Sequence, residues 1–145
     1  MSDLETRHSP HGAFVFARPV VAQARPPFPV RLGRQTELRP DLLVARYVDL
    51  VRDELTAPPL LTVEVGSPAS DVVDRSLKRM VYAHHRVPSY WLVDPETPAL
   101  TVLELDGTGD YRPVADVVGA ETFLARRPFP VRICPLELVA GLRPC

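Results

Sequence analysis

The chain has 145 residues, of which 46% are hydrophobic and 24% charged, as in a single globular domain and unlike a disordered chain. Its formal net charge of −1 excludes a strongly basic nucleic-acid binder, but not an enzyme that meets nucleic acid through a local patch. No apolar run approaches the ~18 residues of a membrane span, and the polar start (Met1 to Arg7) is unlike a signal peptide. Two cysteines, Cys134 and Cys145, are too few for a disulfide framework. We therefore expect a cytoplasmic protein that does not bind membranes.

Prolines interrupt the first forty residues. Within them the pattern predicts a strand at residues 13–17 and a second at 28–32. Between these, a short helix is predicted at 19–24, with Pro19 at its first position, where the missing N–H is not needed. The rest of residues 1–37 is predicted to be irregular.

The pattern is clearer from Asp41 onward. Two short apolar runs, at residues 41–46 and 60–65, are predicted strands, and the β-branched residues of the second are typical of a buried strand. Residues 70–85 are predicted to form a helix capped by Ser70 or Asp71. The side chains at spacings of three and four that are predicted to face the core are Val73, Leu77, Met80, Val81 and His84.

The second half of the chain continues with strands. Residues 90–94 are a predicted strand ended by Pro95, and 100–105 and 111–114 are a predicted hairpin around a turn at 106–109. Residues 136–140 are a predicted final helix. Strands, a central helix and further strands indicate an α/β fold with a mixed central sheet and a flanking helix.

The chain has a single lysine among seventeen basic residues, and no asparagine. This bias is typical of GC-rich codon usage, which exchanges lysine for arginine wherever the two are equivalent. They are not equivalent where a compact ammonium is needed. Lys78 is therefore the first candidate for chemistry, although chance could also leave one lysine.

Two acids are predicted to meet at one end of the sheet. If strands 41–46 and 60–65 pair antiparallel, Asp41 at the start of the first lies beside Glu64 at the end of the second. Neighbouring carboxylates raise each other's pKa unless a cation lies between them. Carboxylate oxygens suit Mg²⁺ or Mn²⁺, and the lack of a His or Cys cluster disfavours zinc. The alternative is a pair of solvated strand ends.

The helix supplies a third element. On a helical wheel Asp74, Lys78 and His85 lie along one edge of the apolar stripe, with Lys78 able to reach the sheet end that carries the acids. The alternative for Lys78 is a plain Asp74–Lys78 surface pair, worth only ~0.3–0.5 kcal/mol. The wheel places Arg75 and Arg79 outward, and His84 is predicted to be packed.

A set of motifs in this order resembles a known family. The segments are LRPDLLV from residue 38, LTVEVGSPAS from residue 61, Asp74 with Lys78, Tyr82, and VPSYWLVDP from residue 87. Together they resemble the Uma2 family, also called DUF820, in the PD-(D/E)XK nuclease superfamily. The resemblance covers residues 38–95, with a looser likeness at Tyr111 and at 128–130.

The resemblance implies one Uma2-type domain over residues 1–145 with a restriction-endonuclease-like core, and Mg²⁺- or Mn²⁺-dependent hydrolysis of DNA. It implies Asp41, Glu64 and Lys78 as catalytic residues, and Asp41, Glu64 and the Val65 carbonyl as metal ligands. Gly66 stands where the superfamily has its lysine, and Lys78 matches the lysine that the family carries on the next helix. The remaining residues that match the motifs, and could support the site, are Ser67, Asp74 and Tyr82.

The chain also departs from the family pattern. Typical members begin with a helix and a hairpin that bears a glutamate of the acidic cluster, whereas this N-terminal part is shortened and Glu37 is the only acid nearby. Arg86 replaces a glycine that often serves as a left-handed helix cap. The alternative function is therefore an inactive nuclease-fold protein that binds DNA, through Arg75, Arg79 and Arg86, or a protein partner.

Other functions find less support. A serine hydrolase using Ser67 with His84 or His85 lacks the G-x-S-x-G elbow. No Walker A loop or dinucleotide fingerprint is present, so no nucleotide cofactor is expected. A homodimer is compatible with cutting both DNA strands, but no residue indicates it.

Overall fold

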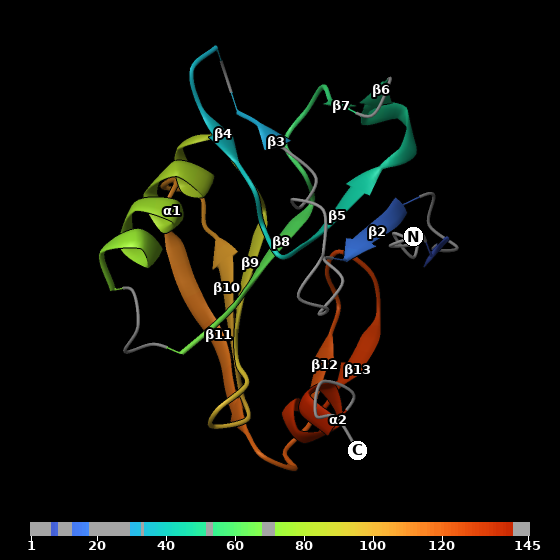
Figure 1. Ribbon diagram of the computed structural model, residues 1–145, viewed down its shortest axis with the longest axis vertical. Coiled ribbons are helices and arrows are strands. Elements are labelled where there is room, and N and C mark those ends of the chain that lie inside the picture. Colours follow the sequence, from blue (N-terminus) through green and yellow to red (C-terminus); the bar gives the residue numbers. More distant parts are fainter. Residues whose placement is uncertain are drawn as a thin grey trace, which may run out of the picture.

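The computed structural model describes residues 7–8, 13–17, 30–32, 34–51, 54–67 and 72–140. Its centre is a seven-stranded sheet in the order β1-β2-β5-β8-β9-β10-β11 (Figure 1). The strands of this sheet are β1 (Arg7–His8), β2 (Ala13–Ala17), β5 (Leu42–Arg46), β8 (Leu61–Val65), β9 (Ser89–Asp94), β10 (Ala99–Leu105) and β11 (Tyr111–Val118). All neighbouring pairs are antiparallel except β8 and β9, which are parallel. The predicted α/β class with a mixed sheet is confirmed.

Three two-stranded ribbons and three helical segments complete the described chain. The ribbons pair β3 (Val30–Arg31) with β4 (Glu37–Leu38), β6 (Leu50–Val51) with β7 (Glu54–Leu55), and β12 (Phe123–Ala125) with β13 (Val131–Ile133). The helical segments are α1 (Val72–His84), α2 (Pro135–Ala140) and the 3-10 turn η1 (Tyr47–Asp49). Neither α1 nor α2 has the length and hydropathy that a bilayer-spanning helix requires.

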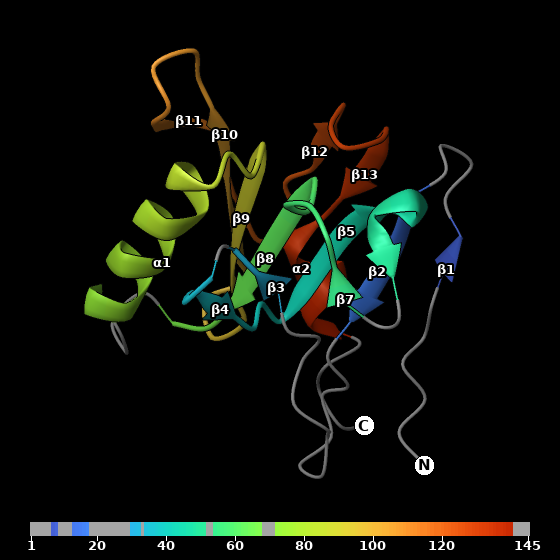
Figure 2. The same ribbon diagram turned by 90° about the horizontal axis from the view of Figure 1, so that it is seen from above.

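Helix α1 connects the parallel strands β8 and β9. Parallel neighbours need such a crossover, because a tight turn reverses the chain direction. Seen from above, α1 lies on one side of the central strands, whereas β12, β13 and α2 lie on the other (Figure 2). The sheet is therefore covered on both faces, with α1 against the face that carries the candidate site.

Side-chain alternation along the strands builds a separate core on each face. Tyr90 of β9 and Leu43 of β5 pack with Tyr82 of α1 in one cluster. Trp91 and Val44, each one residue further along, belong to the other cluster, which the β12–β13 ribbon covers. The period of two thus decides which strand residues face α1.

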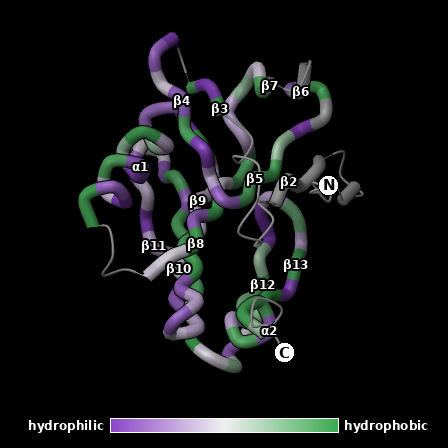
Figure 3. Tube along the Cα trace, viewed as in Figure 1, coloured by the Kyte–Doolittle hydropathy of each residue, from purple (hydrophilic) through white to green (hydrophobic). Residues whose placement is uncertain are grey.

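The predicted core face of α1 is mostly wrong, because only its Val81 packs, partly buried, against the core. Val73, Leu77 and Met80 are 80%, 59% and 69% exposed, and His84 is also exposed. The first turn of α1 stands out as a hydrophobic end at the edge of the molecule (Figure 3). The buried residues of α1 are Tyr82, which lies opposite the predicted stripe, and Ala83. Instead, charged side chains of α1 reach toward the sheet and bind polar groups there.

Helix α1 ends in a left-handed residue, as the family pattern predicts for this position. Arg86 has a φ of 61°. The Val87 amide donates to the Tyr82 carbonyl and the Arg86 amide to the Ala83 carbonyl, both at 3.0 Å. These two bonds form a Schellman motif, with arginine in the place that glycine usually takes.

Other predicted elements agree to within a few residues. The strand at 13–17 is confirmed, the hairpin around 106–109 forms, and its second strand runs on to Val118 instead of ending at 114. Of the predicted strand at 28–32, only Val30–Arg31 is a strand among the described residues. The predicted helix at 19–24 and the cap at Ser70 or Asp71 lie outside the described residues. The β12–β13 ribbon was not predicted.

Candidate active site

The pairing of β5 with β8 brings Asp41 and Glu64 to the same end of the sheet. The strands are antiparallel with Leu42 opposite Val63, so the residue before β5 lies beside the end of β8. The Val65 amide donates to Asp41 Oδ2 at 2.8 Å. This bond holds the Asp41 carboxylate next to the backbone that follows Glu64.

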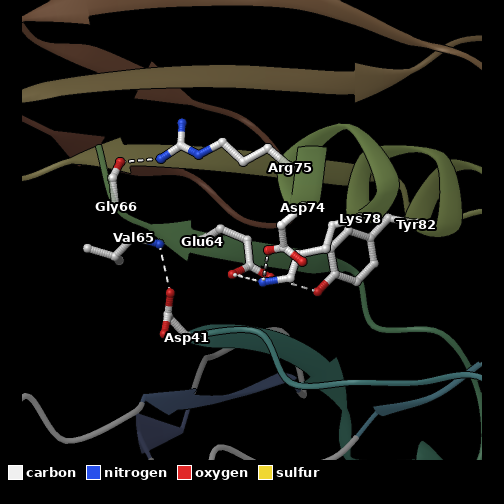
Figure 4. A network of polar contacts seen from close by, with 8 residues as sticks. All are labelled: Asp41, Glu64, Val65, Gly66, Asp74, Arg75, Lys78 and Tyr82. Carbon is white, nitrogen blue, oxygen red and sulfur yellow. Dashed lines mark hydrogen bonds and ion pairs between the residues drawn. The ribbon is translucent and has the colours of Figure 1, made fainter. Parts of the chain in front are cut away.

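Glu64 points toward α1 because it alternates with Val63, which belongs to the opposite core. Only 7% of the residue is exposed. Its Oε1 accepts a hydrogen bond from the Tyr82 hydroxyl at 3.0 Å, and its Oε2 accepts one from Lys78 Nζ at 3.2 Å (Figure 4). A buried carboxylate is costly unless it is paired, and two side chains of α1 supply partners here.

Lys78 bridges two carboxylates. Besides Glu64, its ammonium pairs with Asp74 Oδ2 at 3.0 Å, one helical turn earlier on α1. The Lys78 side chain is 23% exposed, whereas that of Asp74 is 44% exposed. The predicted surface pair of Asp74 and Lys78 therefore exists, but it is part of a network that extends to the buried Glu64.

The electrostatics of the network follow from burial and charge. Burial raises the pKa of Glu64, and the Asp41 charge adds to this, while Lys78 and Tyr82 oppose it. Burial by itself lowers the pKa of Lys78, but its contacts with Asp74 and Glu64 outweigh this and raise the pKa. Burial and the Glu64 charge raise the pKa of Tyr82, so its hydroxyl keeps the proton that it donates.

Two arginines predicted to face outward bind the sheet instead. The Arg75 guanidinium donates to the Gly66 carbonyl (Figure 4), and Arg79 Nη2 donates to the Tyr111 carbonyl at 2.7 Å. Arg75 thus binds the backbone two residues after Glu64. The helical wheel did not predict these contacts of Arg75 and Arg79, because the wheel was oriented by the apolar stripe. The spacing of Asp74, Lys78 and Tyr82 at steps of four would have indicated the correct face.

The remaining predicted residues are arranged as follows. Ser67 is half-buried, two residues beyond the end of β8. His85 stacks edge-on against His84, 5.0 Å between ring centroids, and is not part of the polar network. Glu37 pairs with Arg39 at 2.9 Å on the surface.

The donor set suits a hard divalent cation. Asp41 and Glu64 offer carboxylate oxygens, and within the described part of the chain no group of three or more His, Cys, Asp or Glu side chains forms a ready-made metal cage. Mg²⁺ is commonly held by one or two carboxylates together with waters and substrate phosphates. The pKa of Glu64 is raised mainly by burial, and the Asp41 charge adds to this rise.

Comparison with known proteins identifies a family and a similar solved structure. Residues 13–137 match the Uma2 family, described as "Putative restriction endonuclease". The fold is similar to the crystal structure of a protein from Anabaena variabilis described as a putative nuclease belonging to DUF820, with a TM-score of 0.61 and 19% identity. The match covers 92% of this chain and 72% of that one. No curated protein matches.

Proposed function

The chain belongs to the Uma2 family, and we propose that it is a metal-dependent endonuclease that hydrolyses DNA phosphodiester bonds with Asp41, Glu64 and Lys78. The observation that carries this proposal is the meeting of two carboxylates and the chain's single lysine at one end of the sheet. Asp41 directly precedes β5, Glu64 lies on β8 and Lys78 lies on α1, so the fold brings together residues that are far apart in the sequence.

Each residue has a distinct role in the proposed reaction. Asp41, Glu64 and the Val65 carbonyl hold Mg²⁺ or Mn²⁺, which supplies the polarisation of the phosphate and the acidification of water. Lys78 stabilises the negative charge that grows on the phosphoryl oxygens, a task for which an ammonium is suited. Tyr82 and Asp74 keep Glu64 and Lys78 in place, and Arg75 fixes the backbone beside them.

The alternative of an inactive DNA-binding protein loses part of its basis. It relies on Arg75, Arg79 and Arg86 as DNA contacts, and the guanidiniums of Arg75 and Arg79 each already donate a hydrogen bond to a backbone carbonyl of the protein itself. By contrast, the network around Glu64 holds charged groups in a partly buried position, an arrangement that costs desolvation free energy and is common at functional sites.

Plasmid nicking with Mg²⁺ or Mn²⁺ tests the proposal. Wild type should nick supercoiled DNA. Asp41→Ala and Lys78→Ala should each lower the rate of nicking by a factor of about 10² or more. Glu137→Gln is the matched control, because Glu137 pairs with Arg132 on the surface of another element and should keep full activity. Equal cleavage by all four proteins would assign the signal to a contaminant and contradict the proposal.

Metal binding gives a second readout that is independent of substrate. A ligand of the folded state at 100 times its Kd adds about 2.7 kcal/mol to the free energy of unfolding. Wild type should gain this stability with Mn²⁺, and Asp41→Ala should gain little. A metal effect of the same size in both proteins would place the cation elsewhere.

A further inference from the structure

The Lys78 ammonium lies between a buried carboxylate and a more exposed one. It is 3.2 Å from Glu64 Oε2 and 3.0 Å from Asp74 Oδ2. The Glu64 side chain is 9% exposed and that of Asp74 is 44% exposed. Lys78 therefore already satisfies Glu64, and it has a second anion available on the solvent side of the same helix.

Both oxygens of Glu64 are engaged by α1. Oε1 accepts from the Tyr82 hydroxyl, and Oε2 faces Lys78. A divalent cation bound to Oε2 would lie within a few ångströms of the ammonium. Like charges at that separation repel strongly in a site screened from water. The cation and Lys78 therefore cannot both keep full contact with the same oxygen.

We propose that Lys78 is the counter-ion of Glu64 until a divalent cation displaces it from Oε2, an inference that rests on the proposed function. Asp74 is then the positioning residue that retains the displaced ammonium. Asp74 is one helical turn from Lys78 and already in contact with it, so the ammonium needs only a small side-chain movement. Asp74 thereby keeps the lysine beside the phosphate site after the metal has taken its place on Glu64.

In this arrangement Asp74 acts on metal binding through Lys78. This role differs from a direct attraction between the Asp74 charge and the cation. If Asp74 only attracted cations by its charge, its removal would weaken metal binding equally with or without Lys78. If it acts by holding the lysine, its removal matters only when the lysine is present. A double-mutant cycle distinguishes the two, because it isolates the coupling between contacting residues.

The experiment is a calorimetric titration of the full chain with Mn²⁺ at pH 8, without DNA. The proteins are wild type, Lys78→Met, Asp74→Asn, the double variant, and Glu137→Gln as control. We expect Lys78→Met to tighten Mn²⁺ binding about tenfold and Asp74→Asn to weaken it about tenfold, a coupling typical of residues in contact. In the K78M background, Asp74→Asn should change the Kd less than about twofold.

The outcomes separate this inference from the proposed function. If wild type and K78M bind Mn²⁺ equally, or K78M binds more weakly, the competition is refuted while the metal site stands. If Asp74→Asn weakens binding equally in both backgrounds, Asp74 is not a positioning residue. If wild type, K78M and the Glu137→Gln control all fail to bind Mn²⁺ while circular dichroism shows them folded, the metal-dependent function fails and takes this inference with it.

Discussion

The Asp41 carboxylate accepts a hydrogen bond from the Val65 amide at 2.8 Å, across 24 positions of sequence. The bond ties the residue before β5 to the last residue of β8, so it fixes one acid relative to the backbone next to the other. An amide and a carboxylate form a charge-assisted hydrogen bond, which is stronger than a neutral one. Asp41 therefore has a structural task besides the proposed metal binding, and substitutions can separate the two.

Asp41→Asn should abolish cleavage while it leaves the protein nearly as stable as wild type. The asparagine side-chain oxygen can still accept the Val65 amide, but it lacks the charge that a metal ligand needs. Asp41→Ala should abolish cleavage and also lower the free energy of unfolding by about 1 kcal/mol, because the amide loses its partner. Urea unfolding and plasmid nicking on the same preparations measure both effects. Substantial cleavage by Asp41→Asn would contradict the role of Asp41 as a ligand.

Two buried tyrosines should respond in opposite directions to loss of the hydroxyl. The Tyr111 hydroxyl donates to the Val87 carbonyl at 2.6 Å, whereas the described part of the chain offers no partner to that of Tyr90. Tyr111→Phe should lower the free energy of unfolding by about 1–2 kcal/mol. Tyr90→Phe should leave it unchanged or raise it by up to about 1 kcal/mol. The two variants are each other's control in urea unfolding, and an equal loss in both would show that Tyr90 has a partner.

The left-handed backbone at the end of α1 predicts how substitutions of Arg86 change the stability of the protein. An L-residue at its φ of 61° is strained by roughly 1 kcal/mol, and glycine is not. The arginine side chain also lies against Gly109 in the β10–β11 turn, so a change to glycine removes a contact as well. Arg86→Ala and Arg86→Gly both remove that contact, and Arg86→Gly should be the more stable by about 1 kcal/mol. Equal urea midpoints for the two would show that the backbone is relaxed.

Much of the central sheet could be predicted from local pattern. The strands at 13–17, 41–46 and 60–65 are short apolar runs bounded by prolines or an acid, and antiparallel pairing of the last two brings Asp41 to Glu64 without further information. The roles of these residues, and the metal, stay predictions. The geometry that the sequence implied for them, however, is present.

The orientation of α1 could not be predicted from its apolar periodicity, because its polar contacts override that periodicity. Val73, Leu77 and Met80 are spaced like a core face, yet the sheet beneath the helix presents the Glu64 carboxylate and the Gly66 and Tyr111 carbonyls. These groups pair with cationic side chains, and the long stems of lysine and arginine cover apolar surface on the way. Periodicity within a segment carries no information about the surface that the segment meets.

Stability should fall steeply above pH 10. Burial raises the pKa of Tyr82, Tyr90 and Tyr111, so at high pH the folded chain keeps phenolic protons that the unfolded chain has lost. The stabilisation is complete below the ordinary phenol pKa of about 10 and is lost as the pH rises above it. Each buried phenol lowers the free energy of unfolding by about 1.4 kcal/mol per pH unit in this range.

Urea unfolding at pH 9, 10 and 11 should show this fall in stability. Tyr111→Phe should make the fall less steep by the contribution of one phenol. Absorbance of phenolate from more than one of the four tyrosines before the circular dichroism changes would contradict the prediction, because three of the four are buried.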